Sequence, residues 1–216
     1  MAELFITVEG LDGSGKSTQL RLASEWLRHR GLEHRVTQEP GGTLLGEAIR
    51  SVFLNTKEEW STVDGTVEAL LIFASRRQHL MEIIDPTLAS GLHVLCDRFT
   101  DSTLAYQGFG RGVPLDTLRR MDDLATGGRV PDRTLLFDLP AELARSRGHS
   151  LSRQDEPGGV DRLDAEDLAF YDRVRLGYLE LAAAEPERIR VIDSAGSIED
   201  TQRQVDTVLT EVFGAT

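Results

Sequence analysis

The stretch EGLDGSGKST, residues 9–18, directly follows the short apolar run LFITV at residues 4–8. It fits the Walker A pattern G-x-x-x-x-G-K-S, with Gly10, Gly15, Lys16 and Ser17 at the defining positions. Glycines let the backbone turn tightly and point N–H groups at phosphate oxygens, and a helix that begins after the loop adds the positive end of its dipole. The alternative is a plain glycine-rich turn between a strand and a helix.

We predict that the whole loop binds nucleotide phosphates. In such loops the lysine reaches the β- and γ-phosphates and the hydroxyl after it ligates Mg²⁺, which assigns these roles to Lys16 and Ser17. The predicted nucleotide-binding residues are Gly10, Leu11, Asp12, Gly13, Ser14, Gly15, Lys16, Ser17 and Thr18.

The chain has 216 residues, which suits one α/β domain, and its formal net charge is -12. An acidic balance argues against broad binding to nucleic acid or to an anionic membrane, so local arginines and backbone N–H groups must hold any phosphate. Cys96 is the one cysteine and lies in an apolar run, which favours a buried thiol. The N-terminus has no signal-peptide pattern, and we expect a cytoplasmic protein.

Apolar runs alternate with longer segments of helical periodicity along the chain. This alternation predicts parallel strands joined by right-handed helical crossovers, and hence a three-layer α/β fold. We expect strands at residues 4–8, 34–38, 92–96, 134–137 and 189–192, and helices at residues 16–30, 43–54, 67–88, 115–125, 165–184 and 198–213. The polar, turn-rich residues 150–160 are predicted to form a mobile loop.

A Walker A loop alone is compatible with a GTPase switch, a non-catalytic ATP sensor or a small-molecule kinase. A GTPase needs an Asn-Lys-x-Asp guanine motif, and the one asparagine, Asn55, is followed by Thr56, Lys57 and Glu58. The choice therefore narrows to a kinase or an ATP-driven binding module.

Asp97 and Arg98 directly follow the predicted strand at residues 92–96. Ligands of parallel sheets sit at the carboxyl ends of strands, so we expect both side chains beside the Walker A loop. Asp97 is then a candidate to hold Mg²⁺ through water, and Arg98 a candidate to bind a phosphate. The structural alternative is that Asp97 caps a helix and Arg98 pairs with it.

Motifs along nearly the whole chain resemble those of bacterial thymidylate kinases. They are EGLDGSGKST, EPGGTLLGEAIR, FASRRQHL, DRFTDSTLAYQGFGRG, PDRTLLFD and DRLDAEDLAFYDRVRLGYLELA. The resemblance implies a P-loop NTPase fold with a five-stranded parallel sheet flanked by helices, forming a single nucleoside monophosphate kinase domain over residues 1–216. It also implies a flexible lid at about residues 145–162, transfer of a phosphoryl group from ATP to dTMP with Mg²⁺ to give dTDP for dTTP synthesis, and a homodimer formed through helices near residues 67–88.

The resemblance also assigns residues to the acceptor site. Asp12 resembles the carboxylate near the sugar 3′-hydroxyl, Glu39 and Pro40 belong to the loop that walls the site, and Arg50 resembles a ligand of the acceptor phosphate. Taken from the residues alone, Glu39 is equally a strand-end carboxylate and Arg50 a solvated helix residue.

In LLIFASRRQHL the family has an aromatic residue that stacks on thymine and, one turn later, an arginine for the acceptor phosphate. The spacing fits Phe73 with Arg77, whereas the SRRQHL register points to Arg76 and puts Ile72 at the aromatic position. We predict Phe73 and Arg76, with Phe73 as ordinary core the rival. Further predicted contacts to dTMP, besides a phosphate contact from Arg98, are Ser102, Tyr106 and Gln107.

The family places a transition-state arginine either in the Walker A loop or in the lid. No arginine occurs at residues 11–14, so the resemblance implies that the lid supplies the charge. Arg145, Arg147, Arg153 and Arg162 are available there, and we predict that Arg147 and Arg153 act with Lys16 and Arg98. Alternatively, these arginines are solvated.

Two other functions stay open on the sequence. One is a nucleoside monophosphate kinase for another base, which the pocket around Phe73, Ser102 and Gln107 would distinguish. The other is a catalytically silent ATP-binding regulator, which the presence of Asp97, Arg98 and the lid arginines disfavours.

Overall fold

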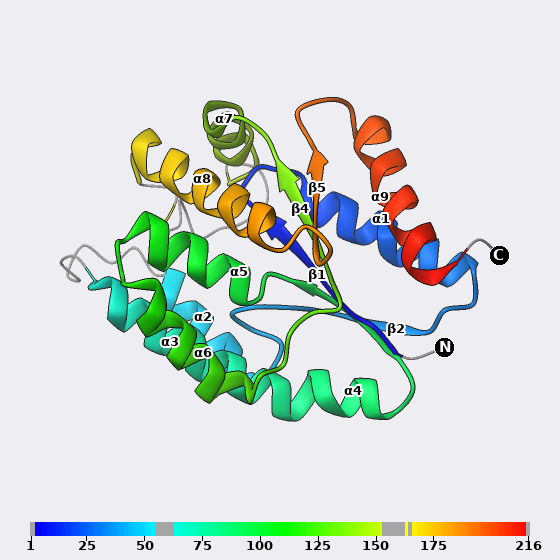
Figure 1. Ribbon diagram of the computed structural model, residues 1–216, viewed down its shortest axis with the longest axis horizontal. Helices are drawn as coiled ribbons and strands as arrows, with labels where there is room; N and C mark the ends of the chain where they lie inside the picture. Colours follow the sequence, from blue (N-terminus) through cyan, green and yellow to red (C-terminus); the bar gives the residue numbers. More distant parts are fainter. Residues whose placement is uncertain (1–2, 55–62, 153–162, 164–165, 215–216) are drawn as a thin grey trace.

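The computed structural model describes residues 3–54, 63–152, 163 and 166–214 (Figure 1). The strands of this part of the chain form one parallel sheet in the order β2-β3-β1-β4-β5. They are β1 (Phe5–Gly10), β2 (His34–Gln38), β3 (His93–Asp97), β4 (Arg133–Asp138) and β5 (Ile189–Asp193). The predicted five-stranded parallel sheet is confirmed.

Helices cover both faces of the sheet, with α1 and α9 together on one side and the larger group on the other (Figure 1). The longer helices are α1 (Lys16–His29), α2 (Leu44–Leu54), α3 (Gly65–His79), α6 (Leu115–Thr126), α7 (Ala141–Ser152), α8 (Leu168–Ala184) and α9 (Ile198–Phe213). The shorter ones are α4 (Asp85–Ala89), α5 (Thr100–Thr103) and the π-helical turns η1 (Leu80–Ile84) and η2 (Leu104–Gly110).

Side chains of β1 point alternately to the two faces of the sheet, and each face has its own buried cluster. Ile6 and Val8 pack with Leu27 of α1 and Leu209 of α9 in one buried cluster. Phe5 points the other way and packs with residues of η1 and β3. Because side chains alternate along a strand, Glu9 shares the face of Phe5 and is directed into the larger helical layer.

The register brings the predicted motifs to one edge of the sheet. Val8 of β1 pairs with Asp97 of β3, and the Arg98 N–H donates to the Val8 carbonyl oxygen at 3.0 Å. The Walker A loop leaves β1 only two residues later. Both motifs therefore lie at the carboxyl edge of the sheet, as parallel α/β proteins place their ligand sites.

Most of the predicted helices and strands begin and end within two or three residues of the observed ones. The predicted helix at residues 67–88 corresponds to three consecutive segments, α3, η1 and α4. Pro86 stands in the first turn of α4. A proline there has no N–H to donate to the preceding turn, which accounts for the change of helical hydrogen bonding just before it.

Two helical segments were not predicted. Residues 100–110, in α5 and η2, contain threonines and glycines, which are poor helix formers. Tertiary packing overrides this preference: a Cβ on Gly110 would lie 2.6 Å from Cε2 of Phe170, so glycine lets η2 approach α8 closely. The helix α7 occupies the start of the segment that we treated as lid.

Candidate active site

The Walker A loop joins β1 to α1 and is held open by glycines. Gly13 has φ +81°, and a Cβ there would lie 2.1 Å from the carbonyl oxygen of Ala144, so only glycine allows the loop to contact α7. Lys16 Nζ donates to the carbonyl oxygens of Gly10 at 3.1 Å and Leu11 at 2.8 Å. Burial lowers the pKa of Lys16, and the nearby Arg98 lowers it further.

Arg98 lies at the centre of the site. Its guanidinium donates to Asp12 Oδ1 at 2.7 Å, which is also 3.7 Å from Lys16 Nζ. Burial by itself would raise the pKa of Asp12, but Arg98 and Lys16 together hold it well below its usual range, so this carboxylate is ionised. The other acceptors of the Arg98 guanidinium are Gly10 O, Ser102 Oγ, Tyr178 OH and Tyr106 OH, at 3.0–3.3 Å.

Glu9, which the sequence analysis did not select, lies beneath Arg98. It is fully buried and accepts hydrogen bonds from the Phe99 N–H at 2.7 Å, Ser102 Oγ at 2.5 Å and Tyr178 OH at 3.1 Å. Burial above all, and the negative charge of Asp101, raise the pKa of Glu9 to about 7. A polar residue on the inward face of a buried strand was the signal in the sequence.

A first cavity of about 560 Å³ lies between the Walker A loop, α2, α3 and η2. Nine of the ten residues predicted to bind dTMP line it: Asp12, Glu39, Pro40, Arg50, Arg76, Arg98, Ser102, Tyr106 and Gln107. Its apolar walls come from Ile72, which the SRRQHL register puts at the aromatic position, and from Phe53, Leu54 and Leu163, which were not predicted. The structure thus brings together residues from well-separated segments around one cavity.

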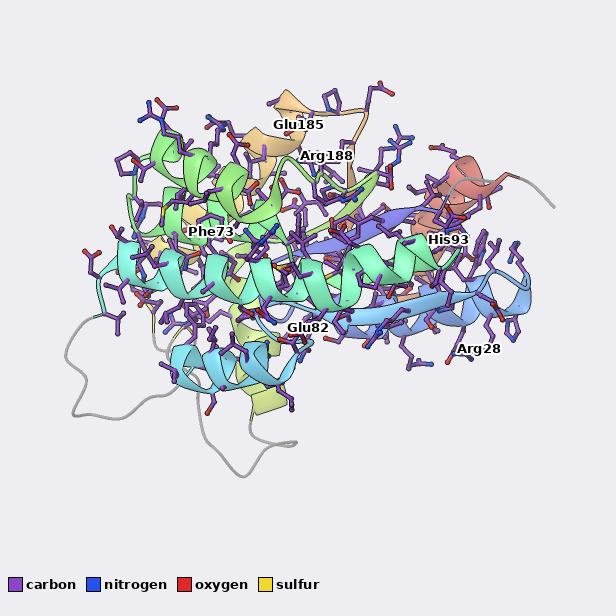
Figure 2. The ribbon with its side chains drawn as sticks, turned by 90° about the horizontal axis from the view of Figure 1, so that it is seen from below. Arg28, Phe73, Glu82, His93, Glu185 and Arg188 are labelled. Carbon is purple, nitrogen blue, oxygen red and sulfur yellow. The ribbon has the colours of Figure 1, made fainter. Side chains whose placement is uncertain are left out.

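Phe73 is the predicted residue that does not line the first cavity; Ile72 takes that place. Residues four apart share a face of a helix, so Ile72 and Arg76 point roughly the same way, and Phe73 is turned about 100° from Ile72. The Phe73 side chain is buried in the core (Figure 2). Its ring centroid is 5.1 Å from the Arg76 guanidinium carbon. The geometry corresponds to the rival interpretation of Phe73 as core.

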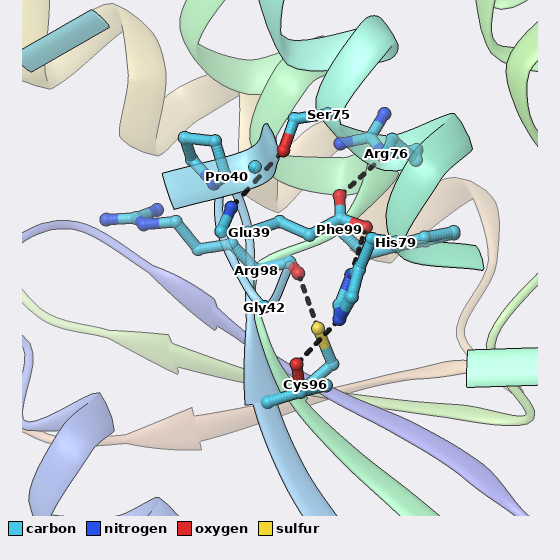
Figure 3. A network of polar contacts seen from close by, with 12 residues as sticks. Glu39, Pro40, Gly42, Ser75, Arg76, His79, Cys96, Arg98 and Phe99 are labelled. Atoms are coloured by element: carbon cyan, nitrogen blue, oxygen red, sulfur yellow. Dashed lines mark hydrogen bonds and ion pairs between the residues drawn. The ribbon is translucent and has the colours of Figure 1, made fainter. Parts of the chain in front are cut away.

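Arg76 is held by a network of buried polar groups. Its Nε donates to Glu39 Oε2 at 2.8 Å, and the other carboxylate oxygen of Glu39 is 2.9 Å from Nδ1 of His79 (Figure 3). The remaining guanidinium nitrogens donate to Asp122 and Thr103. Since Arg76 and Glu39 are almost completely buried, this ion pair fixes the position of both side chains on the wall of the first cavity.

A second cavity lies on the other side of the Walker A loop, beside α7 and the start of α9. Gly13, Gly15 and Thr18 line it from the loop side, and Arg147 and Ser197 from the opposite side. Arg147 donates to the carbonyl oxygens of Ser194 at 2.8 Å and Ala195 at 3.0 Å. Arg153 and Arg162 lie outside the described residues, so the predicted catalytic role of Arg153 has no structural counterpart here.

A third cavity shares lining residues with each of the first two. Lys16, Ser17, Arg50, Asp97 and Arg98 line it, whereas Arg76 does not. Oδ1 of Asp97 is buried and has no hydrogen-bond partner among the described residues. A carboxylate oxygen of this kind beside a serine hydroxyl is the oxygen donor set that Mg²⁺ prefers, so the two predicted metal ligands fit that ion.

The glycine-rich phosphate loop has Arg98 beside it and a cavity on either side. This arrangement is that of a P-loop nucleoside monophosphate kinase. The protein-family model for thymidylate kinase matches residues 8–205. The chain is 47% identical over 209 residues to a thymidylate kinase of Pseudomonas fluorescens, covering 97% of this chain and 96% of that one. It is 43% identical over 214 residues to one of Neisseria gonorrhoeae, covering 99% and 100%.

Among solved structures, the crystal structure of a thymidylate kinase from Ehrlichia chaffeensis superposes with a TM-score of 0.75. Its sequence identity is 33%, and the match covers 97% of this chain and 99% of that one. The chain belongs to the thymidylate kinase family. It is a phosphotransferase that converts dTMP to dTDP with ATP, a step in dTTP synthesis.

Proposed function

We propose that dTMP occupies the first cavity and ATP the second, and that their phosphates meet in the third. The observation that carries this assignment is that Arg98 lines both the first and third cavities, while Lys16 lies beside it on the Walker A loop. Two phosphate groups repel each other, and a pair of cations between them favours the approach. Arg50 also lines both cavities, which supports its role at the acceptor phosphate.

For the base of dTMP we propose the apolar end of the first cavity, between Phe53 and Ile72. Arg76 lines the first cavity but not the third, which favours a role at the base over the predicted role at the phosphate. A guanidinium has five N–H donors, and an oxygen on the pyrimidine edge is an acceptor that suits them. Asp12 and Tyr106, hydrogen-bonded to each other at 3.2 Å, support a place for the sugar.

In the proposed mechanism, alignment and charge neutralisation do most of the work, because the acceptor is already an anion. Lys16 binds the phosphates of ATP and Arg98 binds that of dTMP, so the moving phosphoryl group passes between two fixed cations. Ser17 and Asp97 would hold Mg²⁺, which would supply positive charge against the negative charge of the phosphates. Arg147 lines the second cavity, which supports a role toward ATP; its catalytic role, and that of Arg153, stay predictions.

We further propose a homodimer. Val67, Leu70 and Met81 on α3 and η1 are 48%, 55% and 56% exposed, and their spacing places them along one side of the helix. Leu44 of α2, 94% exposed, adds to the apolar surface of this helical layer. Leu70→Asp places a charge on this face and is expected to shift the chain to monomer in light scattering, whereas Leu176→Asp on α8 is not. A dimer that persists in Leu70→Asp would oppose the proposal.

The substrate assignment is tested by coupled ADP release with dTMP, dUMP, dCMP, AMP and GMP. We expect a higher kcat/KM for dTMP than for dCMP, AMP and GMP, because Arg76 and Gln107, which line the first cavity, suit a pyrimidine with a donor at N3. Since dUMP has the same donor at N3, its kcat/KM relative to dTMP measures the contribution of the 5-methyl group. Equal or better turnover of a purine monophosphate would overturn the assignment of the cavity.

The organisation as a single domain with a lid, and the cytoplasmic location, stay predictions from the sequence. Within the described ranges, no helix is both long and apolar enough to cross a membrane.

A further inference from the structure

We propose that Glu68, which lies outside the first cavity, is a positioning residue that makes the site select thymine over cytosine by fixing the amide of Gln107. The inference rests on the proposed binding of the dTMP base in the first cavity. Glu68 belongs to α3 and is fully buried, and Gln107 belongs to η2 and is 1% exposed. Neither the Walker A pattern nor the acceptor motifs single out Glu68.

Hydrogen bonding at Glu68 determines which way the Gln107 amide faces. Gln107 Nε2 donates to Glu68 Oε2 at 2.9 Å, and Arg111 Nε donates to Glu68 Oε1 at 3.1 Å. Both contacts are made by N–H groups, so the carboxylate oxygens of Glu68 act as acceptors. Turning the amide by 180° would put its oxygen against Glu68 and leave two acceptors facing each other, so the nitrogen must point toward Glu68.

The same orientation leaves the Gln107 oxygen available to a ligand. Gln107 lines the first cavity, and its Oε1 is buried without a hydrogen-bond partner in the part of the chain that the structure describes. A buried, unpaired acceptor costs free energy, which a ligand that donates to it removes. A ligand with a hydrogen-bond donor opposite the Gln107 oxygen is therefore favoured in this cavity.

Thymine meets this requirement and cytosine does not. Thymine has an N–H at position 3 and an oxygen at position 4, whereas cytosine has a lone pair at position 3 and an amino group at position 4. With the Gln107 oxygen and the donors of Arg76 held in place, cytosine would set acceptor against acceptor and donor against donor. Sites of this kind discriminate strongly because their buried polar groups are left unpaired by the wrong substrate.

The test is the ratio of kcat/KM for dTMP to that for dCMP in Glu68→Gln. A glutamine at this position can accept from the Gln107 nitrogen or donate to its oxygen, so both amide orientations become possible. We expect the ratio to fall at least tenfold, with a higher KM for dTMP, a higher kcat/KM for dCMP and little change in kcat for dTMP. A smaller fraction of folded protein would lower the apparent kcat/KM for dTMP and for dCMP by the same factor, so their ratio would not change.

Glu166→Gln is the matched control, because Glu166 pairs with the same arginine, with its Oε1 2.6 Å from Arg111 Nη1, but is not bonded to Gln107. Its ratio should equal that of the wild type. If Glu68→Gln does not fold, Glu68→Met combined with Arg111→Met replaces the buried ion pair by apolar groups and equally releases the amide. An unchanged ratio in the folded variant overturns the proposal. A wild-type enzyme that shows no preference for dTMP over dCMP would instead refute the base assignment itself.

Discussion

Replacement of Glu9 by glutamine should change how the stability of this enzyme depends on pH. Glu9 of β1 is fully buried against Ser102 of α5 and Tyr178 of α8, and its pKa is raised from the ordinary 4.5 to about 7. The folded protein therefore binds a proton more tightly at this position than the unfolded chain does. Stability from this group is fully present below pH 4.5 and is lost as the pH rises toward 7.

The size of the effect follows from the shift. One pKa unit corresponds to about 1.4 kcal/mol, so a rise from 4.5 to about 7 amounts to about 3 kcal/mol across that interval. Glutamine has nearly the same shape but does not titrate. The free energy of unfolding of the wild type, minus that of Glu9→Gln, should therefore fall by about 3 kcal/mol between pH 4.5 and pH 8, most of it between pH 5 and 7.

Urea unfolding followed by circular dichroism at half-unit pH steps measures this difference, and other titrating groups cancel between the two proteins. Glu25→Gln is the control, because Glu25 pairs with Arg21 on an exposed part of α1. This variant loses an exposed carboxylate, so it reports what the removal of a glutamate does away from the buried site. A flat difference between the wild type and Glu9→Gln would refute the reasoning, because it would mean that the folded protein does not disfavour the ionised carboxylate.

Three further predictions concern activity. Lys16→Met should lower kcat at least a hundredfold with the circular dichroism spectrum unchanged, since the ammonium is lost but the buried stem is retained; full turnover would exclude the assigned role. Asp97→Asn should raise the Mg²⁺ concentration for half-maximal rate about tenfold, measured by magnesium titration at saturating nucleotides, and an unchanged titration would remove Asp97 from the metal site. Ile72→Ala should raise KM for dTMP several-fold while Phe73→Leu, a change in the core, lowers stability and leaves that KM nearly unaltered; the reverse pattern would restore Phe73 to the base site.

The fold was predictable because each of its signals is local. Buried parallel strands appear as short apolar runs, and the Walker A loop needs glycines and a lysine at fixed spacing. The position of Asp97 and Arg98 followed from a general property of parallel sheets. The helical turns of residues 100–110 were missed because their stability comes from contacts with α8 and α6, not from the propensities of their own residues.

The site was less predictable where the decisive contact is made by a residue distant in sequence. Ile72 and Phe73 are adjacent and both belong to the buried core, but only Ile72 also lines the first cavity. Glu9 and Glu68 have ordinary places in a strand and a helix, and only the packed structure shows that each is buried against polar groups. No local pattern encodes which partner a buried carboxylate will have.

Arg98 shows why such buried carboxylates matter to the site. It is the one non-glycine residue with positive φ, +69°, in the described part of the chain, a conformation that costs about 1 kcal/mol or more. Glu9 accepts from the Phe99 N–H on the backbone and from Ser102 and Tyr178, whose oxygens are then left to accept from the guanidinium. A hydroxyl has one proton to give, so donation to Glu9 directs its lone pairs toward Arg98. One carboxylate, Glu9, thus helps to hold both the backbone and the side chain of Arg98. The strained backbone conformation persists because contacts next to the main chain and at the guanidinium both fix it.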